Sequence, residues 1–190
     1  MTPHKHFTNP DDQRKGPNCG VTAVAIASGV SFNRAWNVFK TMGVTYYQKR
    51  NWKGGTFTHH QATALDKLGI EHEKVAFNRC NLRTLVKTLE RGKLYMVTTG
   101  SHVQLVMDDH VIDQQGAKHI EDYWGKKKFV ENIREIKTPF KNAIEREQVI
   151  DAQKTNVATI PTQSHDTLFP SLFQDKRTTT HSSATQLTLF

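Results

Sequence analysis

Apolar residues recur at helical spacing through the first half of the chain, in four stretches separated by glycines. The first stretch, 20–28, is small and apolar almost all round, which is typical of a helix buried on most faces. In the fourth, apolar side chains from Leu82 to Leu89 repeat with a period of about 3.6 residues. The pattern predicts four helices, over 19–28, 32–42, 59–68 and 82–91, with N-caps at Asn18, Ser31, Thr58 and Asn81.

The second half of the chain carries shorter runs of β-forming residues. The runs 93–99, 103–107, 110–113 and 129–137 predict strands, and 44–57 is expected to be a loop with a turn at Gly54-Gly55. Asp108 and Asp109 predict a two-residue hairpin turn, which would pair residues whose numbers sum to 217. Helices followed by antiparallel strands predict an α+β fold, with N-terminal helices packed on a C-terminal antiparallel sheet.

The composition shifts after Thr138-Pro139. From residue 151 the chain is rich in Ser, Thr and Gln and lacks Trp, Tyr, Cys and Gly, so it can bury too little surface to offset its chain entropy. We expect this stretch to be disordered. A short helix over 141–153, which overlaps its start, is an open alternative. The sequence therefore predicts a domain over 1–139 and a tail over 140–190.

The formal net charge of +8 is unevenly distributed. From Lys141 to the end, five basic residues balance five acidic ones, so the whole positive surplus lies in residues 1–140. Such a domain attracts nucleic acid or acidic partners, although a solvated lysine-rich surface is the simpler interpretation. The clusters Arg14-Lys15 and 126–128 are too short to name a nucleic-acid motif, so weak nucleic-acid contact stays an open expectation.

Membrane contact is not expected. No apolar run reaches the roughly 20 residues that span a bilayer, and residues 1–15 lack the apolar block of a secretory signal. The two cysteines make no disulfide framework. These features favour an intracellular, cytoplasmic protein.

Cys19 opens the first predicted helix. The free N–H groups and the dipole at a helix start favour negative charge, so a thiol there is more readily held as a nucleophilic thiolate. Cys80 precedes the Asn81 cap without a matched partner, and we expect it to be structural. A reactive thiol would also need a base, a group that orients the base, and donors for an oxyanion.

The predicted strands supply candidates for these roles. His102 heads one strand and Asp113 closes the next, and the predicted register puts them diagonally on the same face, where Gln104 opposes Asp113. A carboxylate within reach of the imidazole would fix its tautomer and stabilise its charged form. Gln13, six residues before Cys19, offers a side-chain amide as an oxyanion donor.

This order of residues resembles the papain-like cysteine peptidases over roughly 13–137, and the six-residue interval from Gln13 to Cys19 is that of the family. The resemblance implies a papain-like fold in which Cys19 attacks an acyl carbon, His102 transfers the proton and Asp113 orients His102. Gln13 and the Cys19 backbone N–H would bind the oxyanion. The chain departs from the family in the sequence PNCGVTA around the cysteine, in Asp as third member, and in its close spacing to His102. Compact relatives include peptidases, amidases and acyltransferases, so the fold alone does not determine the reaction. We take a peptidase as the first hypothesis and keep the other two reactions as alternatives.

Metal and cofactor sites are not expected. The pairs His4/His6 and His59/His60 occur without a CxxC or HExxH motif, and adjacent helical histidines do not easily share one metal. No Lys-Ser/Thr follows the Gly54-Gly55 pair to complete a phosphate loop.

The last five residues, QLTLF, resemble the QLxLF peptide by which bacterial replication and repair proteins bind the β sliding clamp. The resemblance implies that Leu187, Leu189 and Phe190 occupy apolar subsites while Gln186 hydrogen-bonds at the rim. A long polar tether would keep the peptide accessible. An accidental apolar C-terminus is the alternative, although such an ending is sticky on a polar tail. Clamp binding would place the protein in a bacterial cytoplasm, encoded by a bacterium, plasmid or phage.

Two functions are consistent with these features. The first is a papain-like thiol hydrolase, foremost a peptidase, recruited to the sliding clamp by its C-terminal peptide. The alternative is a non-enzymatic DNA- or protein-binding module whose thiol is incidental and whose tail engages the clamp. The reactivity of Cys19 relative to Cys80 separates them.

Overall fold

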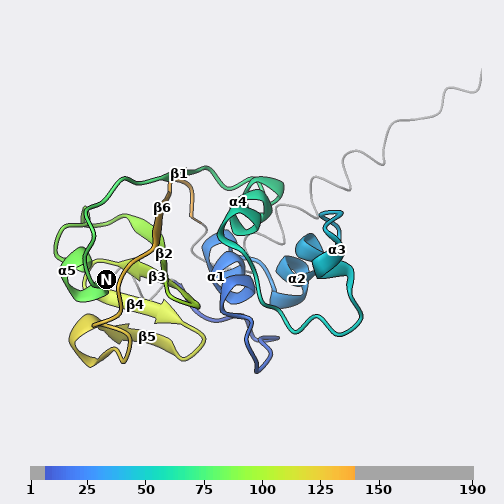
Figure 1. Cartoon of the computed structure of the whole chain (residues 1–190), viewed down its shortest axis with the longest axis horizontal. Coiled ribbons are helices and arrows are strands. Elements are labelled where there is room, and N and C mark those ends of the chain that lie inside the picture. Colours follow the sequence, from blue (N-terminus) through green and yellow to red (C-terminus); the bar gives the residue numbers. More distant parts are fainter. Residues whose placement is uncertain (1–6, 140–190) are drawn as a thin grey trace, which may run out of the picture. The chain divides into compact units, whose positions relative to one another are not determined.

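The computed structural model describes residues 7–139 of the 190-residue chain (Figure 1). All of them belong to the first of the two units, 1–158 and 159–190, into which the chain divides. The helices and strands follow in the order α1 Cys19–Ser28, α2 Phe32–Lys40, α3 Thr45–Gln48, α4 Thr58–Lys67, β1 His72–Lys74, α5 Leu82–Val86, β2 Leu94–Thr99, β3 His102–Met107, β4 His110–Asp113, β5 Gly116–His119, the 3₁₀ turn η2 Ile120–Asp122 and β6 Asn132–Ile136. The predicted α+β class is confirmed.

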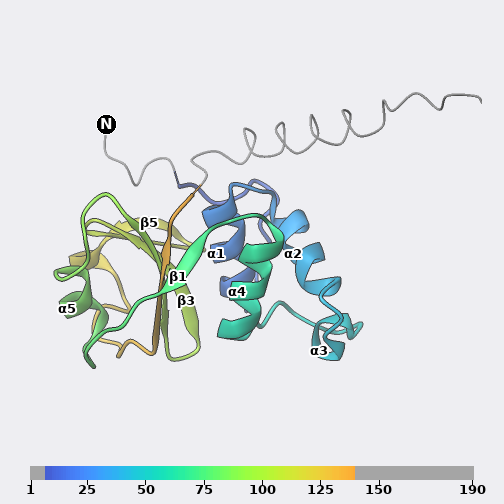
Figure 2. The same cartoon turned by 90° about the horizontal axis from the view of Figure 1, so that it is seen from above.

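The strands form a six-stranded antiparallel sheet in the order β1-β6-β2-β3-β4-β5. Helices α1, α2 and α4 lie on one side of the sheet and α5 on the other (Figure 2). Leu94 and Met96 of β2 belong to the core cluster that includes α1, α2 and α4, and Tyr95 and Val97 to the cluster that includes α5 and η2. All six residues of β2 are therefore buried, which explains its nearly continuous apolar sequence, since a strand covered on both faces has no solvent side.

The β3–β4 hairpin has the predicted register. Leu105 pairs with Ile112 and Met107 with His110, which leaves Asp108 and Asp109 as the two-residue turn. Asp108 adopts a positive φ of 52°, the left-handed conformation that such turns require. Its carboxylate accepts a 2.8 Å hydrogen bond from the Gly92 N–H, which ties the turn to the start of β2.

Two of the four predicted helix caps are confirmed. The Ser31 side chain accepts a hydrogen bond from the Arg34 N–H, and Asn81 accepts one from Thr84. Asn18 occupies the cap position of α1, but its side chain does not cap the helix. The Thr58 cap is wrong as well, because Thr58 is the first helical residue and Phe57 precedes the helix without a side-chain cap.

Several elements differ from their predicted extents for local reasons. The helix expected to run to Gly92 ends at Val86, where the Thr88 N–H and hydroxyl both bond to the Leu85 carbonyl. The strand expected over 129–137 is narrower, at Asn132–Ile136. Strands β1 and β5 and helix α3 were not predicted, because these short elements lack the Val and Ile residues that mark the equally short strand over 110–113.

Part of the expected loop over 44–57 is held by an aromatic cluster. The ring of Trp52 packs on Trp36 at 4.2 Å and on Tyr47 at 5.0 Å. Its indole N–H donates to the Gly55 carbonyl at 2.7 Å, and Gly54 lies against Asn18. These contacts fix the glycine turn beside the start of α1.

The predicted tail, its short helix over 141–153, and Gln186–Phe190 all lie outside the described residues. The domain boundary at 139 therefore stays a prediction. Among helices of residues 7–139, none has the length and apolar character needed to cross a bilayer.

Gly54 offers a test of the contact between the glycine turn and α1. An added Cβ would lie 2.5 Å from the Asn18 Cβ, at a φ of +104° that side chains rarely adopt. We expect Gly54→Ala to lower the free energy of unfolding by about 2–4 kcal/mol, from backbone strain and overpacking together. Urea denaturation measures the loss.

Gly116→Ala is the matched control, because Gly116 also has a positive φ (+91°) but nothing lies within 4 Å of the added Cβ. It should cost about 1–2 kcal/mol from strain alone. Equal losses in the two variants would contradict tight packing of the turn on α1.

Candidate active site

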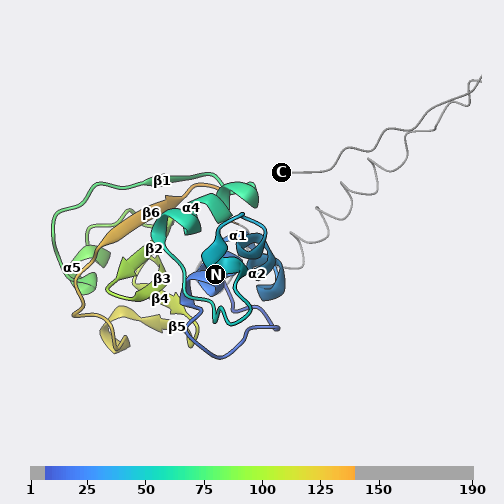
Figure 3. The same cartoon turned by 45° about the vertical axis from the view of Figure 1, so that its right-hand side comes forward.

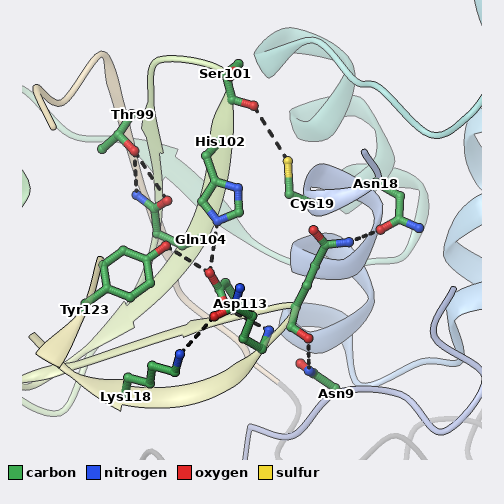
Figure 4. Close-up of polar contacts among 12 residues, drawn as sticks. Asn9, Asn18, Cys19, Thr99, Ser101, His102, Gln104, Asp113, Lys118 and Tyr123 are labelled. Atoms are coloured by element: carbon green, nitrogen blue, oxygen red, sulfur yellow. Dashed lines mark hydrogen bonds and ion pairs between the residues drawn. The ribbon is translucent and has the colours of Figure 1, made fainter. Parts of the chain in front are cut away.

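Cys19 is the first residue of α1, at the end of an otherwise buried helix (Figure 4). The nine residues from Gly20 to Ser28 are all buried, whereas Cys19 is partly exposed. The Asn18 side chain turns away from the helix, because its amide N–H donates to the Arg14 carbonyl at 2.9 Å and its oxygen accepts from Gln114. The first turn of α1 therefore has no side-chain cap, which leaves its N–H groups available to an anion.

His102 is placed beside this helix end by a tight hairpin. Thr99 of β2 pairs with His102 of β3, so Gly100 and Ser101 form the two-residue turn, with Gly100 at a φ of +58°. The Cys19 sulfur lies 3.8 Å from the Ser101 carbonyl oxygen. Figure 4 shows the imidazole turned with one ring nitrogen toward Asp113 and the other side toward Cys19.

Asp113 accepts a hydrogen bond from the imidazole. His102 Nε2 lies 3.1 Å from Asp113 Oδ2, and the Asp113 side chain is 2% exposed. The Tyr123 hydroxyl donates to the same oxygen at 2.9 Å, and the Gln115 N–H donates to Oδ1 at 2.8 Å. These hydrogen bonds compensate for the desolvation of the buried carboxylate and hold it facing His102.

The three groups support one another's charged forms. Burial alone would lower the pKa of His102, but the hydrogen bonds to Asp113 and Cys19 and their negative charges raise it to about 9. Burial alone would raise the pKa of Cys19, and the bonds from His102 and the Val103 N–H together with the imidazolium charge lower it instead. Burial likewise opposes ionisation of Asp113, yet its bonds to His102, Gln115 and Tyr123 lower its pKa. The mutual effect favours a thiolate–imidazolium pair over two neutral groups.

Gln13 is placed differently from its predicted role. Its side-chain N–H donates to the Gln114 carbonyl at 3.0 Å, and Gln13 does not line the pocket at Cys19. Asn9 donates to the same carbonyl at 3.0 Å. Gln114 itself lines the pocket, and its side-chain amide donates to the Gly16 carbonyl and to Asn18. Gln13 therefore supports the segment that carries Gln114, while its oxyanion role stays a prediction.

A pocket of about 510 Å³ opens beside the sulfur. Its lining includes three of the four exposed large aromatic or apolar side chains of the described chain, namely Tyr46, Phe57 and Trp124. The glycine turn contributes Gly55 and the neighbouring Thr56. Apolar walls around a nucleophile suit an organic substrate that extends to both sides of the reacting atom.

Three residues of the site were missed by sequence reasoning. Tyr123 and Trp124 follow η2 in a stretch without periodic signal, and the Trp124 ring packs at a tilt against the His102 ring, with centroids 5.3 Å apart. Gln114 directly follows Asp113, and this adjacency is the one signal that pointed to it.

Within residues 7–139, no group of three His, Cys, Asp or Glu side chains is arranged to hold an ion. The His59 and His60 rings lie 3.9 Å apart, and His60 Nδ1 hydrogen-bonds to the Tyr47 hydroxyl at 2.8 Å.

Chemically, the site at Cys19 combines a nucleophile, a proton carrier and an orienting carboxylate, which are the groups that acyl transfer needs.

The reactivity of the two cysteines should differ with pH. Because the pKa of Cys19 is lowered, its alkylation by iodoacetamide should persist near pH 6.5, about 10–100-fold faster than that of Cys80. As the pH falls through this lowered pKa the sulfur gains its proton and the rate drops. Mass spectrometry of both cysteine peptides from one reaction measures the ratio, with Cys80 as internal reference.

His102→Asn provides the control for the imidazole. Without the imidazolium, alkylation of Cys19 near pH 6.5 should fall toward the rate of Cys80. An unchanged Cys19 rate in this variant would contradict the charge pair.

The chain was compared with known proteins in three ways. Comparisons with protein-family models, with curated proteins and with solved structures each gave no match to this chain. Membership of a family is therefore not established, and the function is inferred from the residues of the site.

Proposed function

We propose that the domain is a papain-like cysteine hydrolase that cleaves peptide bonds. The observation that carries the proposal is the linked series Cys19, His102 and Asp113, with the sulfur at a helix start and the imidazole 3.1 Å from a buried carboxylate. This series is a nucleophile, a base and an orienting group, each within reach of the next.

In the first half of the proposed reaction, the Cys19 thiolate forms a bond to the carbonyl carbon of the substrate. The carbonyl oxygen gains negative charge, and the Cys19 backbone N–H at the uncapped start of α1 stabilises it. Gln114 is the second candidate donor besides Gln13, because its amide lines the pocket, although it must release Gly16 or Asn18 to serve.

In the second half, the imidazolium of His102 gives its proton to the leaving amine as the carbon–nitrogen bond breaks. The acyl group then remains on Cys19, and water deprotonated by His102 releases it as a carboxylic acid. Asp113 keeps Nε2 of the imidazole occupied, so that the other nitrogen faces the reacting atoms. An amidase or acyltransferase would use the same steps with another acceptor or leaving group.

A peptide substrate is favoured by the pocket. Its volume of about 510 Å³ and its aromatic walls suit amino-acid side chains beside the reacting carbonyl. The glycine turn at Gly55 brings backbone close to the site without a side chain in the way.

Cys19→Ala should abolish hydrolysis of a quenched-fluorescent peptide library, with a loss of roughly 1,000-fold or more, because the variant has no atom to carry the acyl group. Circular dichroism and the urea midpoint should stay close to those of the native protein. Cys80→Ala, which removes the other thiol, is the matched control and should retain activity. Full activity in Cys19→Ala would overturn the assignment.

The second part of the proposal concerns the C-terminus. We propose that Gln186–Phe190 binds the bacterial β sliding clamp, with Leu187, Leu189 and Phe190 in apolar subsites and Gln186 at the rim. Its support is the sequence QLTLF itself. Such a tether would bring the hydrolase to proteins at the replication machinery, in the cytoplasm of a bacterium or phage-infected cell.

Deletion of Gln186–Phe190 should eliminate binding to purified clamp in surface plasmon resonance while leaving peptide hydrolysis intact. The double variant Leu189→Ala/Phe190→Ala should lose at least about 10-fold in affinity, since two apolar anchors are removed. Thr188→Ala is the control, because the motif tolerates any residue there. Native affinity after the deletion would refute the clamp claim.

A non-enzymatic binding module is the second candidate. It is favoured by the net charge of +8, whose surplus lies in residues 1–140. This function predicts a slow, ordinary thiol at Cys19 and salt-sensitive binding to DNA.

A further inference from the structure

Besides His102, the pocket beside Cys19 carries one cationic side chain, Lys128, and no Asp or Glu among its lining residues in the described part of the chain. Lys128 is exposed. Its ammonium makes no ion pair within residues 7–139. Other surface cations, such as Arg83, Lys93 and Lys137, are paired with carboxylates. The positive charge at this wall is therefore left for a ligand.

The position of Lys128 is set by its backbone and by one aromatic ring. Its N–H donates to the Gly125 carbonyl at 2.9 Å, and its carbonyl accepts from the Leu82 N–H at 3.0 Å. Its Nζ lies 4.2 Å from the centroid of the Trp124 ring, and Trp124 also contacts His102 with ring centroids 5.3 Å apart. A single side chain thus contacts both the ammonium and the imidazole, which keeps the cation on the wall of the pocket that Cys19 also lines.

We infer that the pocket selects peptides that carry a carboxylate within one residue of the bond to be cleaved, and that Lys128 pairs with this carboxylate. The inference rests on the proposed function, since it names the substrate class of the same site. Tyr46 and Phe57 would contact the apolar part of such a peptide. The carboxylate belongs either to an Asp or Glu side chain or to a free C-terminus.

The chemistry of the wall favours a carboxylate on a peptide over a nucleic acid. Single strands of nucleic acid are bound by several cations along a groove with stacked aromatic rings. The pocket carries one ammonium, whose hydrogen-bonding capacity matches one carboxylate. The remainder of its lining is uncharged apart from the catalytic pair, Cys19 and His102.

Two alkylating reagents of opposite character test the charge directly. Iodoacetate and iodoacetamide both form a bond from the sulfur to carbon as iodide leaves, but only iodoacetate carries a carboxylate. The quantity to compare is the alkylation rate of Cys19 with iodoacetate divided by its rate with iodoacetamide. Dividing this ratio by the same ratio for a small free thiol isolates the effect of the site. We expect this normalised ratio to fall about 3–10-fold in Lys128→Gln and further in Lys128→Glu. High salt should weaken the preference in the native protein.

Lys127→Gln is the matched control, because Lys127 is the adjacent exposed lysine and does not line the pocket. It should leave the ratio unchanged. A ratio that is the same in native protein and Lys128→Gln, with Cys19 still alkylated much faster than Cys80, overturns this inference and leaves the hydrolase proposal standing. Equally slow alkylation of both cysteines overturns the hydrolase proposal and this inference with it.

Matched peptides distinguish the two sources of the carboxylate. One set carries Asp or Asn next to the cleaved bond with an amidated C-terminus, and the other ends one residue beyond that bond as a free acid or an amide. In the set that contains the true source of the carboxylate, the Lys128→Gln variant should show a kcat/KM on the carboxylate peptide that is about 3–10-fold lower than that of the native protein. Its kcat/KM on the uncharged counterpart should not change. Equal cleavage of charged and uncharged peptides in both sets by the native protein would overturn the inference.

Discussion

The contact between the Cys19 sulfur and the His102 imidazole is the interaction on which the rest of the site depends. Burial would push each group toward its neutral form, yet each makes the other's charged form more favourable. The uncapped start of α1 adds N–H groups on the sulfur's side, and Asp113 adds a carboxylate on the imidazole's side. Separating the two groups would return both to ordinary behaviour, and the proposed chemistry would be lost.

The fold supplies rigidity on both sides of this contact. The helix that carries Cys19 is buried along the rest of its length. The hairpins that carry His102 and Asp113 belong to a sheet covered on both faces, as Figure 3 shows from a third direction. The core thus fixes the positions of Cys19, His102 and Asp113 relative to one another, so the proposed reaction would need little further ordering of these groups.

Local rules were enough to predict part of the site. A two-residue turn at Asp108-Asp109 determines the register of its hairpin, so the approach of His102 and Asp113 followed from their numbers alone. The helix start at Cys19 followed from a run of small apolar residues. Both predictions depended on neighbours close in sequence.

Contacts between distant segments could not be predicted in this way. The Asn18 cap was wrong because its side-chain oxygen bonds to Gln114, which lies 96 residues later. Tyr123 contacts Asp113 and Trp124 contacts His102 from an irregular stretch whose path depends on the whole sheet. The position of Gln13, outside the pocket lining, also depends on a contact with a distant segment, because its side chain donates to the Gln114 carbonyl.

The protonation state of His102 is the most direct measure of the central claim. Titration of the imidazole nitrogens by NMR, with the His102 signal identified by its absence in His102→Asn, reports it without any substrate. This imidazole should keep its proton at neutral pH and titrate at about 9. Titration near the ordinary value of 6.5 would contradict it, because the imidazole would then be paired with neither the thiolate nor the carboxylate.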